Sequence, residues 1–408
     1  MNINLTEDKS KTYILACSFG PDSMFLLNVL LENGYNFIVC HVNYHKRPES
    51  NSEEENLRKY CDEHNLKLEV LDTTGLKVKG NFQTWARNIR YEFFEKIYIK
   101  NNASGLFVAH HLDDVLETYL IQKRRGGYVS RYGIAYESKH KSMRVLRPLL
   151  NITKKEIVEY DDNHKIPYSI DSSNLQDSYE RNKYRNHYLK SLSDEEKALL
   201  VKEIEAKNYE LDALISKAKY VLNNREFIPV KEAKQLNKDE FAFVIFGLME
   251  TQGIYAPISS KQVDTLRKNL DSNKANIQVK LGSDISYYQE YFEIRILKNR
   301  KPYSYTIEKP TYFECDDFAI DLSNGGDDRN IHDDDYPITI RTAKNGDKYL
   351  VKGYYSKVNR LFIDWKMPLH LRAIWPIVVN KDDKIIYIPR YRRNFIDNHK
   401  TKFKISLK

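Results

Sequence analysis

Six residues, Ser18-Phe19-Gly20-Pro21-Asp22-Ser23, separate a short apolar run from a longer one, and this junction constrains the fold more than any other segment. Residues 11–17 (KTYILAC) are typical of a buried first strand, and residues 22–31 are typical of a helix packed on a sheet. A turn of small residues between them leaves backbone N–H groups unpaired, and the helix N-terminus adds about half a positive charge. The junction therefore predicts a seat for a phosphate group.

Three residues of this turn carry specific expectations. Gly20 can take a positive φ and lets the backbone approach a ligand closely, and Pro21 fixes the first helical turn. Asp22 would repel bound phosphates unless a metal ion lay between them, so the turn predicts a nucleotide together with Mg²⁺. The alternative is a turn without a ligand that Ser18 or Ser23 caps.

Length and composition bound the class of protein. A chain of 408 residues predicts two to three domains, and its net charge of +8 permits an acidic partner such as RNA without requiring one. Four scattered cysteines (Cys17, Cys40, Cys61 and Cys315) without a C-x-x-C pair are typical of reduced thiols in a cytosolic protein. No signal peptide and no apolar stretch of membrane-spanning length is visible, so we expect a cytoplasmic protein without membrane contact.

Strand-like and helix-like segments alternate through the first half of the chain. The expected strands cover residues 11–17, 36–42, 68–71, 106–109 and 144–146, and the expected helices cover 22–31, 53–64, 83–100, 113–123 and 153–164. This alternation predicts an α/β fold with a doubly wound parallel sheet. Ligands of such sheets bind beyond the carboxyl ends of the strands, where the turn at 18–23 and the segment at 110–114 both fall.

The pattern changes after residue 193. A long helix is expected at 195–222, further helices at 239–250 and 260–270, strands at 277–281 and 291–297, and an acidic linker at 316–335. The tail contains two strand-like runs, ITIRT and KIIYIPR. We therefore predict three domains: residues 1–192, a helical middle region at 193–315, and a small α/β domain at 336–408.

A second polar group begins with His110 and His111 at the end of a buried strand. Asp113, Asp114 and Glu117 follow in the first helical turn, where acids favour the helix dipole without any further function. The two histidines weaken that explanation, since they would point into the same cleft as the turn at 18–23. Zinc could be bound by His and Asp at this spacing, but oxygen ligation of Mg²⁺ near phosphates fits better.

Two further groups suit contact with anions or RNA. Arg87 and Arg90 lie three residues apart on one helix face, which suits either an anion or a merely solvated basic surface. Residues 171–186 interleave aromatic, arginine and asparagine side chains, which suits RNA phosphates and stacked bases or, alternatively, an ordinary capped helix start.

Together these motifs resemble the tRNA(Ile)-lysidine synthetase family of the PP-loop ATP pyrophosphatases. The family's Ser-Gly-Gly-x-Asp-Ser loop is matched at 18–23, with Phe19 in place of the first glycine. Further matches are His-Val-Asn at 41–43, Ala-Arg-x-x-Arg-Tyr at 86–91, Ala-His-His-x-Asp-Asp-x-x-Glu-Thr at 109–118, Arg-Pro-Leu-Leu at 147–150, Asp-Ser-Ser-Asn at 171–174, Tyr-x-Arg-Asn at 179–182, and Arg341, Gly346-Asp347 and Arg360 to Asp364 in the tail. The resemblance is dense over 10–190, thin over 200–330 and moderate after 336.

The resemblance implies an ATP-dependent carbon–nitrogen ligase. Such an enzyme joins free L-lysine to C2 of the wobble cytidine in the isoleucine tRNA with a CAU anticodon, through a cytidine adenylate, and changes the codon read from AUG to AUA. It implies ATP and Mg²⁺, a catalytic ATP-binding domain at 1–192, and tRNA-binding regions at 193–315 and 336–408. The oligomeric state stays open, a homodimer included.

The resemblance also implies residue roles. Nucleotide contacts fall to Ser18, Phe19, Gly20, Pro21, Asp22, Ser23 and His41, catalysis to Asp22, Arg87, His110, Asp113 and Asp114, and Mg²⁺ ligation to Asp22, Asp113 and Asp114. RNA contacts fall to Arg90, Glu117, Asn174, Arg181, Asn182 and Arg185. Asp113, Asp114 or His110 would take the proton of the lysine amine. Phe19 removes one position of free backbone approach, so a somewhat different loop is expected if Phe19 cannot adopt the required φ.

Two other classes of function stay open. Another PP-loop enzyme, such as a tRNA thiolase or an amide-forming synthetase, would need paired or catalytic cysteines or an amidase domain, which the sequence does not display. A non-catalytic RNA-binding protein on the same fold would not need intact Asp22, His110, Asp113 and Asp114. Release of pyrophosphate from ATP that depends on tRNA separates an enzyme from such a binding protein.

Overall fold

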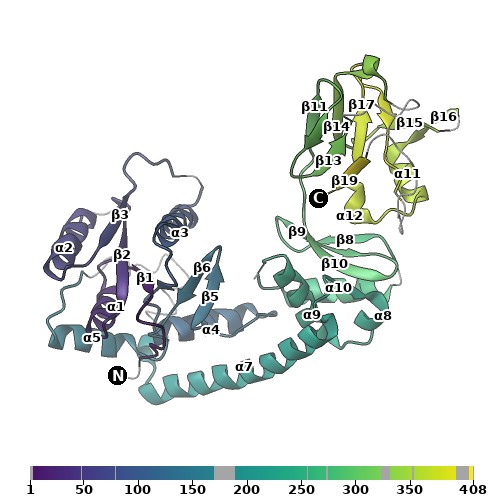
Figure 1. Cartoon of the computed structure of the whole chain (residues 1–408). Coiled ribbons are helices and arrows are strands. Elements are labelled where there is room, and N and C mark those ends of the chain that lie inside the picture. Colours follow the sequence, from purple (N-terminus) through teal and green to yellow (C-terminus); the bar gives the residue numbers. More distant parts are fainter. Residues whose placement is uncertain are drawn as a thin grey trace. The chain divides into compact units, whose positions relative to one another are not determined.

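The structure is a computed structural model that describes residues 3–46, 48–78, 80–169, 189–254, 256–272, 274–322, 331–351, 353–391 and 404–407 (Figure 1). The chain divides into two compact units, Met1–Leu211 and Asp212–Lys408. The boundary falls inside the long helix α7 (Asp194–Leu222), which the sequence predicts almost to the residue. The finer division into three domains stays a prediction.

A six-stranded sheet forms the centre of the first unit, in the order β3-β2-β1-β4-β6-β5. Its parallel strands are β1 (Thr12–Ala16), β2 (Asn36–Asn43), β3 (Leu68–Asp72), β4 (Leu106–Phe107) and β6 (Met143–Leu146). The predicted parallel α/β sheet is confirmed. An additional strand, β5 (Glu137–His140), pairs antiparallel with β6 at one edge, and its polar sequence ESKH gave no strand signal.

Helices cover both faces of this sheet (Figure 1). The helices of this unit that precede α7 are α1 (Pro21–Glu32), α2 (Ser50–Glu63), α3 (Phe82–Lys100), α4 (Leu112–Arg125) and α5 (Lys154–Asn163). Successive side chains of β1 point to opposite faces, so Tyr13 and Leu15 enter a core with α1, α2 and α5, while Ile14 packs with α3. α4 packs instead on α7 and the short 3₁₀ turn η3 (Leu189–Ser191) through Leu116, Tyr119 and Ile204.

The strand order places two loops side by side at the carboxyl edge of the sheet. β1 lies between β2 and β4. The connection after β1 leads to β2 on one side, and the connection after β4 leads to β6 on the other side. Such a reversal opens a crevice in which ligands of doubly wound sheets bind. Residues 17–20 follow β1 and residues 108–111 follow β4, so both predicted polar groups lie at this crevice.

The second unit contains the remaining sheets. Its first part has α8 (Val230–Ala233), α9 (Lys238–Thr251), α10 (Ser260–Asp271) and an antiparallel sheet of β7 (Phe227–Pro229), β10 (Glu293–Lys298), β9 (Ile285–Gln289) and β8 (Ile277–Lys280). The middle region is therefore helical with an added four-stranded sheet, two strands of which the sequence predicts.

The C-terminal part has two small sheets and a hairpin. One sheet contains β11 (Ser304–Ile307), β14 (Ile338–Thr342), β17 (Pro376–Val379) and β18 (Ile385–Tyr387), and the other contains β12 (Tyr312–Glu314), β13 (Phe318–Asp321) and β19 (Lys404–Leu407). The hairpin pairs β15 (Lys348–Val351) with β16 (Tyr354–Lys357), and η4 (Asp333–Asp335), α11 (Val358–Asp364) and α12 (Leu369–Arg372) complete this part.

The interpretation of residues 316–335 as a linker is wrong for its first part. Phe318–Asp321 forms β13, and the side chains of Phe318 and Ile320 are buried in the core of the small sheets. The acidic composition concealed an alternating apolar pattern of only three residues, Phe318, Ile320 and Leu322, which is too short to detect in the sequence.

In the described part of the chain, no helix is both long and apolar enough to cross a membrane.

Candidate active site

In the turn at 18–23, the residue with the positive φ is not the one that the sequence predicts. Phe19 takes a φ of +63°, whereas Gly20 has a φ of −80° and precedes α1 in extended conformation. A non-glycine residue in the left-handed region costs roughly 1–2 kcal/mol. Phe19 offsets this cost by burying its ring in the core shared with α1, and its carbonyl accepts a hydrogen bond from the Ser169 N–H at 2.9 Å. The expectation for Gly20 is therefore wrong, and Phe19 has an explanation.

This geometry predicts an unusual order of stability for two variants. Phe19→Ala and Phe19→Gly both lose the buried ring, but only alanine keeps a Cβ in the left-handed region. We expect the glycine variant to be more stable than the alanine variant by roughly 1 kcal/mol, the reverse of the usual order in helices and strands. Urea unfolding of both variants tests this, and a more stable alanine variant would contradict the observed φ.

No side chain in the described structure caps the N-terminus of α1. The Ser23 hydroxyl instead donates to the Gly20 carbonyl at 2.9 Å and accepts from the Ser18 N–H at 3.2 Å, which holds the turn closed on itself. Pro21 occupies the first turn as predicted. The alternative of a turn that Ser18 or Ser23 caps therefore has no support in this geometry, and the helix N-terminus faces the crevice without a capping group.

A cavity of about 230 Å³ lies beside this turn. Its lining comes from the ends of β1, β2 and β4 and from one face of α3: Ala16, Cys17, Ser18, Asp22, Ser23, Cys40, Val42, Tyr44, Arg87, Arg90, Tyr91, Phe94, Val108, Ala109 and His110. The structure thus brings together Ser18, Asp22, Ser23, Arg87, Arg90 and His110, which the sequence places on three separate segments.

Arg87 and Arg90 supply positive charge to one wall of this cavity. Their guanidinium groups lie 4.7 Å and 5.9 Å from the ring centre of Tyr91, and no carboxylate of the described residues forms an ion pair with either arginine. Stacking on an aromatic ring orients a guanidinium while leaving its N–H groups available. The wall is therefore suited to an anion, and the alternative of a merely solvated basic face does not account for its place in the cavity.

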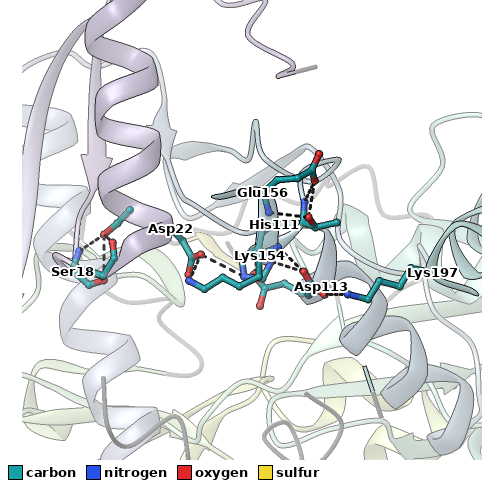
Figure 2. Close-up of polar contacts among 11 residues, drawn as sticks. Ser18, Asp22, His111, Asp113, Lys154, Glu156 and Lys197 are labelled. Atoms are coloured by element: carbon teal, nitrogen blue, oxygen red, sulfur yellow. Dashed lines mark hydrogen bonds and ion pairs between the residues drawn. The ribbon is translucent and has the colours of Figure 1, made fainter. Parts of the chain in front are cut away.

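Next to the cavity, charged side chains from four helices form a chain of contacts (Figure 2). Asp22 Oδ1 lies 2.5 Å from Lys154 Nζ, and the backbone N–H of Lys154 donates to Asp113 Oδ2 at 2.8 Å. Lys197 Nζ from α7 donates to Asp113 Oδ1 at 2.9 Å. Burial would raise the pKa of Asp113, but the contacts with His111, Lys154 and Lys197 outweigh burial and hold that pKa well below its usual range. Asp113 is therefore ionised at neutral pH.

His111 and Asp114 form the N-terminal cap of α4. The backbone N–H of His111 donates to Asp114 Oδ2 at 3.1 Å, so Asp114 does act as an ordinary first-turn acid. The buried imidazole of His111 lies 3.5–3.7 Å from carboxylate oxygens of Asp22, Asp113 and Asp114. Burial lowers the pKa of His111, but these carboxylates raise it more, so its net pKa lies above the ordinary value.

His110 is fixed by a residue to which the sequence assigned no role. The Nε–H of Arg147 donates to His110 Nδ1 at 3.1 Å. A guanidinium has no acceptor, so His110 Nδ1 carries no proton and the neutral ring carries it on Nε2. Arg147 is itself held by the Ala135 carbonyl at 3.0 Å and by Ser138 Oγ of β5 at 2.9 Å. The additional edge strand thus positions Arg147, and through it His110.

Other predicted residues lie apart from the cavity. His41 does not line it; this buried side chain contacts the Cys17 carbonyl through Nδ1 at 2.9 Å and so supports the start of the turn. Glu117 is completely buried and presents no surface to RNA. The predicted RNA contacts Asn174, Arg181, Asn182 and Arg185 lie outside the described residues.

The carboxylates fit a metal ion only in part. Among the described residues, no three His, Cys, Asp or Glu side chains are arranged to hold a metal ion. Asp113 and Asp114 are nearly buried and hold protein N–H groups, whereas the side chain of Asp22 is 31% exposed beside the turn. Mg²⁺ bound to a nucleotide commonly takes only one or two protein carboxylates and otherwise phosphates and water. Asp22 fits that requirement.

The two thiols in the cavity are poor nucleophiles. Burial raises the pKa of Cys17 and of Cys40 well above the ordinary value, so both stay protonated at neutral pH. Catalysis by a cysteine thiolate, which a thiolase would use, therefore has no candidate in this cavity.

Lys154, Lys197 and Arg147 are the site residues to which sequence reasoning gave no role. Lys197 and its partner Asp113 are far apart in the chain, so no local pattern connects them. Lys154 did carry a signal: it opens a helix that Thr153 and Glu156 cap, at an end where the dipole disfavours a cation. A lysine in that position indicates a carboxylate nearby.

Comparison with known proteins agrees with this geometry. Residues 2–192 match the model of a PP-loop domain. Over 405 residues, the chain is 33% identical to a tRNA(Ile)-lysidine synthase of Mycoplasma mycoides, covering 94% of this chain and 97% of that protein. It is 32% identical to the tRNA(Ile)-lysidine synthase of Mesoplasma florum (92% and 96% covered) and 30% identical to that of Staphylococcus aureus (92% of each covered).

Proposed function

This chain belongs to the tRNA(Ile)-lysidine synthases, and from that premise we propose that it attaches lysine to C2 of the wobble cytidine in the isoleucine tRNA with a CAU anticodon. The observation that carries the proposal is the shared cavity. Asp22, a helix N-terminus and two arginines face the same space, and among the described residues no side chain caps that helix and no carboxylate pairs with either arginine. Phosphates of ATP suit such a space. The reaction would take place in the cytoplasm, where ATP and tRNA meet.

In the first step, the C2 oxygen of cytidine attacks the α-phosphorus of ATP, and the bond from that phosphorus to the β-phosphate oxygen breaks. Pyrophosphate leaves, and the cytidine carries an adenylate. This chemistry depends on positioning and on stabilising developing negative charge. The turn at 18–23 would hold the pyrophosphate, and Arg87 and Arg90 would contact the α-phosphate and the incoming nucleotide.

Mg²⁺ would be held by the phosphates of ATP and by the carboxylate of Asp22. When bound, it supplies positive charge that screens the phosphate oxygens. Asp113 and Asp114 would stabilise this arrangement indirectly, because their oxygens already accept hydrogen bonds from Lys154, Lys197 and His111.

In the second step, the ε-amine of lysine forms a bond to C2, the C2–O bond breaks and AMP leaves. The amine must lose a proton, since an ammonium has no lone pair. His110 is a poor acceptor, because Arg147 occupies Nδ1 and the proton sits on Nε2. We assign His110 to donating a hydrogen bond toward a phosphate oxygen. Asp22 would hold the metal and Asp113 is paired with Lys197, so we assign acceptance of the proton to Asp114.

Arg147 provides a test of this assignment. We expect Arg147→Met to slow adenylate formation roughly tenfold to a hundredfold, because the His110 ring loses its fixed orientation. Arg147→Lys should recover part of the rate. Arg144, three residues earlier, pairs with Glu7 and Glu137 instead, so Arg144→Met is a matched control that should keep the wild-type rate. Equal rates for Arg147→Met and wild type would remove His110 from the mechanism.

The later regions would bind the tRNA. Several tyrosines of these regions are exposed, among them Tyr209 and Tyr220 on α7, Tyr291, and Tyr354 and Tyr355 on β16. Exposed aromatic rings beside lysines suit stacking on bases and contact with phosphates. Under this proposal, binding of tRNA weakens steeply as salt increases.

The reaction itself is tested with ATP, Mg²⁺, labelled lysine and an isoleucine tRNA transcript that carries the CAU anticodon. We expect label to enter this tRNA, and not a methionine tRNA with the same anticodon. Folded protein that binds ATP but leaves the isoleucine tRNA unlabelled would refute the proposal. Release of pyrophosphate without lysine transfer would instead indicate another PP-loop tRNA-modifying enzyme.

A further inference from the structure

Lys154 occupies a place that the helix dipole disfavours for a cation. It is the first residue of α5, and its side chain is 39% exposed. Its ammonium nevertheless reaches from α5 to the first turn of α1 and lies 2.5 Å from Asp22 Oδ1 (Figure 2). The carboxylate of Asp22, which among the described residues fits a nucleotide-bound metal, is therefore neutralised by a lysine.

The base of Lys154 is fixed, while its side chain can move. The backbone N–H donates to Asp113 Oδ2 at 2.8 Å, which anchors the start of α5 to the start of α4. Four methylene groups separate that anchor from the ammonium, so the charge can shift by several ångströms without backbone movement. Lys197, the other lysine of the group, is only 16% exposed and is held by Asp113. Lys154 is thus the more exposed cation of the two beside the turn.

We propose that Lys154 is an exchangeable counter-ion. It releases the Asp22 carboxylate to the metal and then binds the terminal phosphates of ATP. This inference rests on the proposed use of ATP at the turn. Without nucleotide, the ammonium neutralises Asp22. When ATP arrives with Mg²⁺, the Asp22 carboxylate turns to the metal, and the ammonium transfers to a non-bridging oxygen of the β- or γ-phosphate. Each charge keeps a partner throughout, so the site binds the nucleotide without leaving Asp22 unpaired.

A purely structural ion pair predicts a different outcome from this exchange. If Lys154 only held α5 against α1, its loss would weaken the binding of ATP and the binding of the metal alike. In an exchange, Lys154 competes with the metal for Asp22 but assists the nucleotide. Its removal should therefore strengthen metal binding and weaken ATP binding.

The experiment compares Lys154→Met with Lys155→Met in the full chain. Lys155 is the next residue of α5 and is exposed, so it is a matched control. Affinity for ATP is measured by calorimetry at saturating Mg²⁺, and affinity for Mn²⁺ is measured by electron paramagnetic resonance without nucleotide. We expect Lys154→Met to bind ATP ten- to a hundredfold more weakly and Mn²⁺ several-fold more tightly. Lys155→Met should change neither affinity.

Lys154→Arg keeps the positive charge and is the control for loss of the side chain's length and packing. Thermal unfolding of each variant detects a folding defect. Lys154→Arg should retain most of the ATP affinity. An unchanged ATP affinity in Lys154→Met would overturn the inference, as would a parallel loss of both affinities. Because no tRNA or lysine is present, the exchange can be demonstrated even if lysine transfer fails, and lysine transfer can be demonstrated even if the exchange fails.

Discussion

Replacing Asp22 by asparagine is expected to slow the tRNA-dependent release of pyrophosphate roughly a hundredfold to a thousandfold. Asparagine has nearly the same size, so the first turn of α1 and the packing around it should persist. The variant loses the negative charge that lies 2.5 Å from Lys154 and that we assign to the metal. Positioned charge is the main contribution that a protein makes to phosphoryl-type chemistry, so its removal should act mainly on the adenylation step.

The measurement is pyrophosphate release in the presence and absence of the isoleucine tRNA, with circular dichroism to establish that the variant folds. Asp62 lies on α2 and is exposed, so Asp62→Asn is a control for the loss of one acidic charge, and we expect it to keep the wild-type rate. A folded Asp22→Asn protein with the wild-type rate would remove Asp22 from the mechanism and the proposed metal ligand with it.

The second large effect concerns Asp161, a carboxylate buried beneath the site. Its side chain on α5 is 0% exposed, and neither oxygen has a hydrogen-bond partner among the described residues. Burial, with a smaller contribution from Asp22, raises the pKa of Asp161 from 3.8 to about 7, against an opposing contribution from Lys154. The folded protein therefore holds this proton over a pH range in which the unfolded chain has lost it.

The direction of the pH effect follows from this difference. Below pH 3.8 both states are protonated, and the contribution of Asp161 to stability is fully present. Between about 4 and 7 only the folded state keeps the proton, so the free energy of unfolding falls as the pH rises, by roughly 4 kcal/mol in total. Above pH 7 the loss is complete. Burying Asp161 thus costs stability at the pH of a typical cell.

We therefore expect Asp161→Asn to be more stable than wild type at pH 8, because its amide cannot ionise. The advantage should shrink as the pH is lowered toward 5. Urea unfolding at several pH values measures it, and Asp162→Asn is the control, since Asp162 is the exposed neighbour that accepts a hydrogen bond from Tyr168. An Asp161→Asn protein that is less stable than wild type at every pH would show that the carboxyl group has a partner.

Much of the catalytic unit could be predicted from the sequence because its central strands are buried on both faces. β1 and β2 read as continuous apolar runs, and α1 between them is a dense apolar segment that is buried on nearly all sides. β5 could not be predicted, because an edge strand with polar side chains carries no such signal. Its role became visible only through Arg147, which it holds against His110.

The site was predictable as a set of residues and less so as a set of contacts. The strand order predicts that Asp22 and His110 lie at one edge of the sheet, and both line one cavity together with Arg87; their roles stay predictions. The partners of the carboxylates could not be predicted, since Asp22 pairs with Lys154 and Asp113 pairs with Lys197 across long separations in the chain. Phe19 shows a third limit: residue type suggested that glycine would take the positive φ, but core burial stabilises the phenylalanine there instead.

The burial of Phe19 joins the nucleotide turn to the hydrophobic core of the catalytic unit. Most surface loops can open locally while the rest of the domain stays folded. Here the turn cannot swing away from a ligand without drawing its aromatic ring out of the core beside α1. A nucleotide held by the turn would therefore stabilise the folded unit as a whole, and not the turn alone.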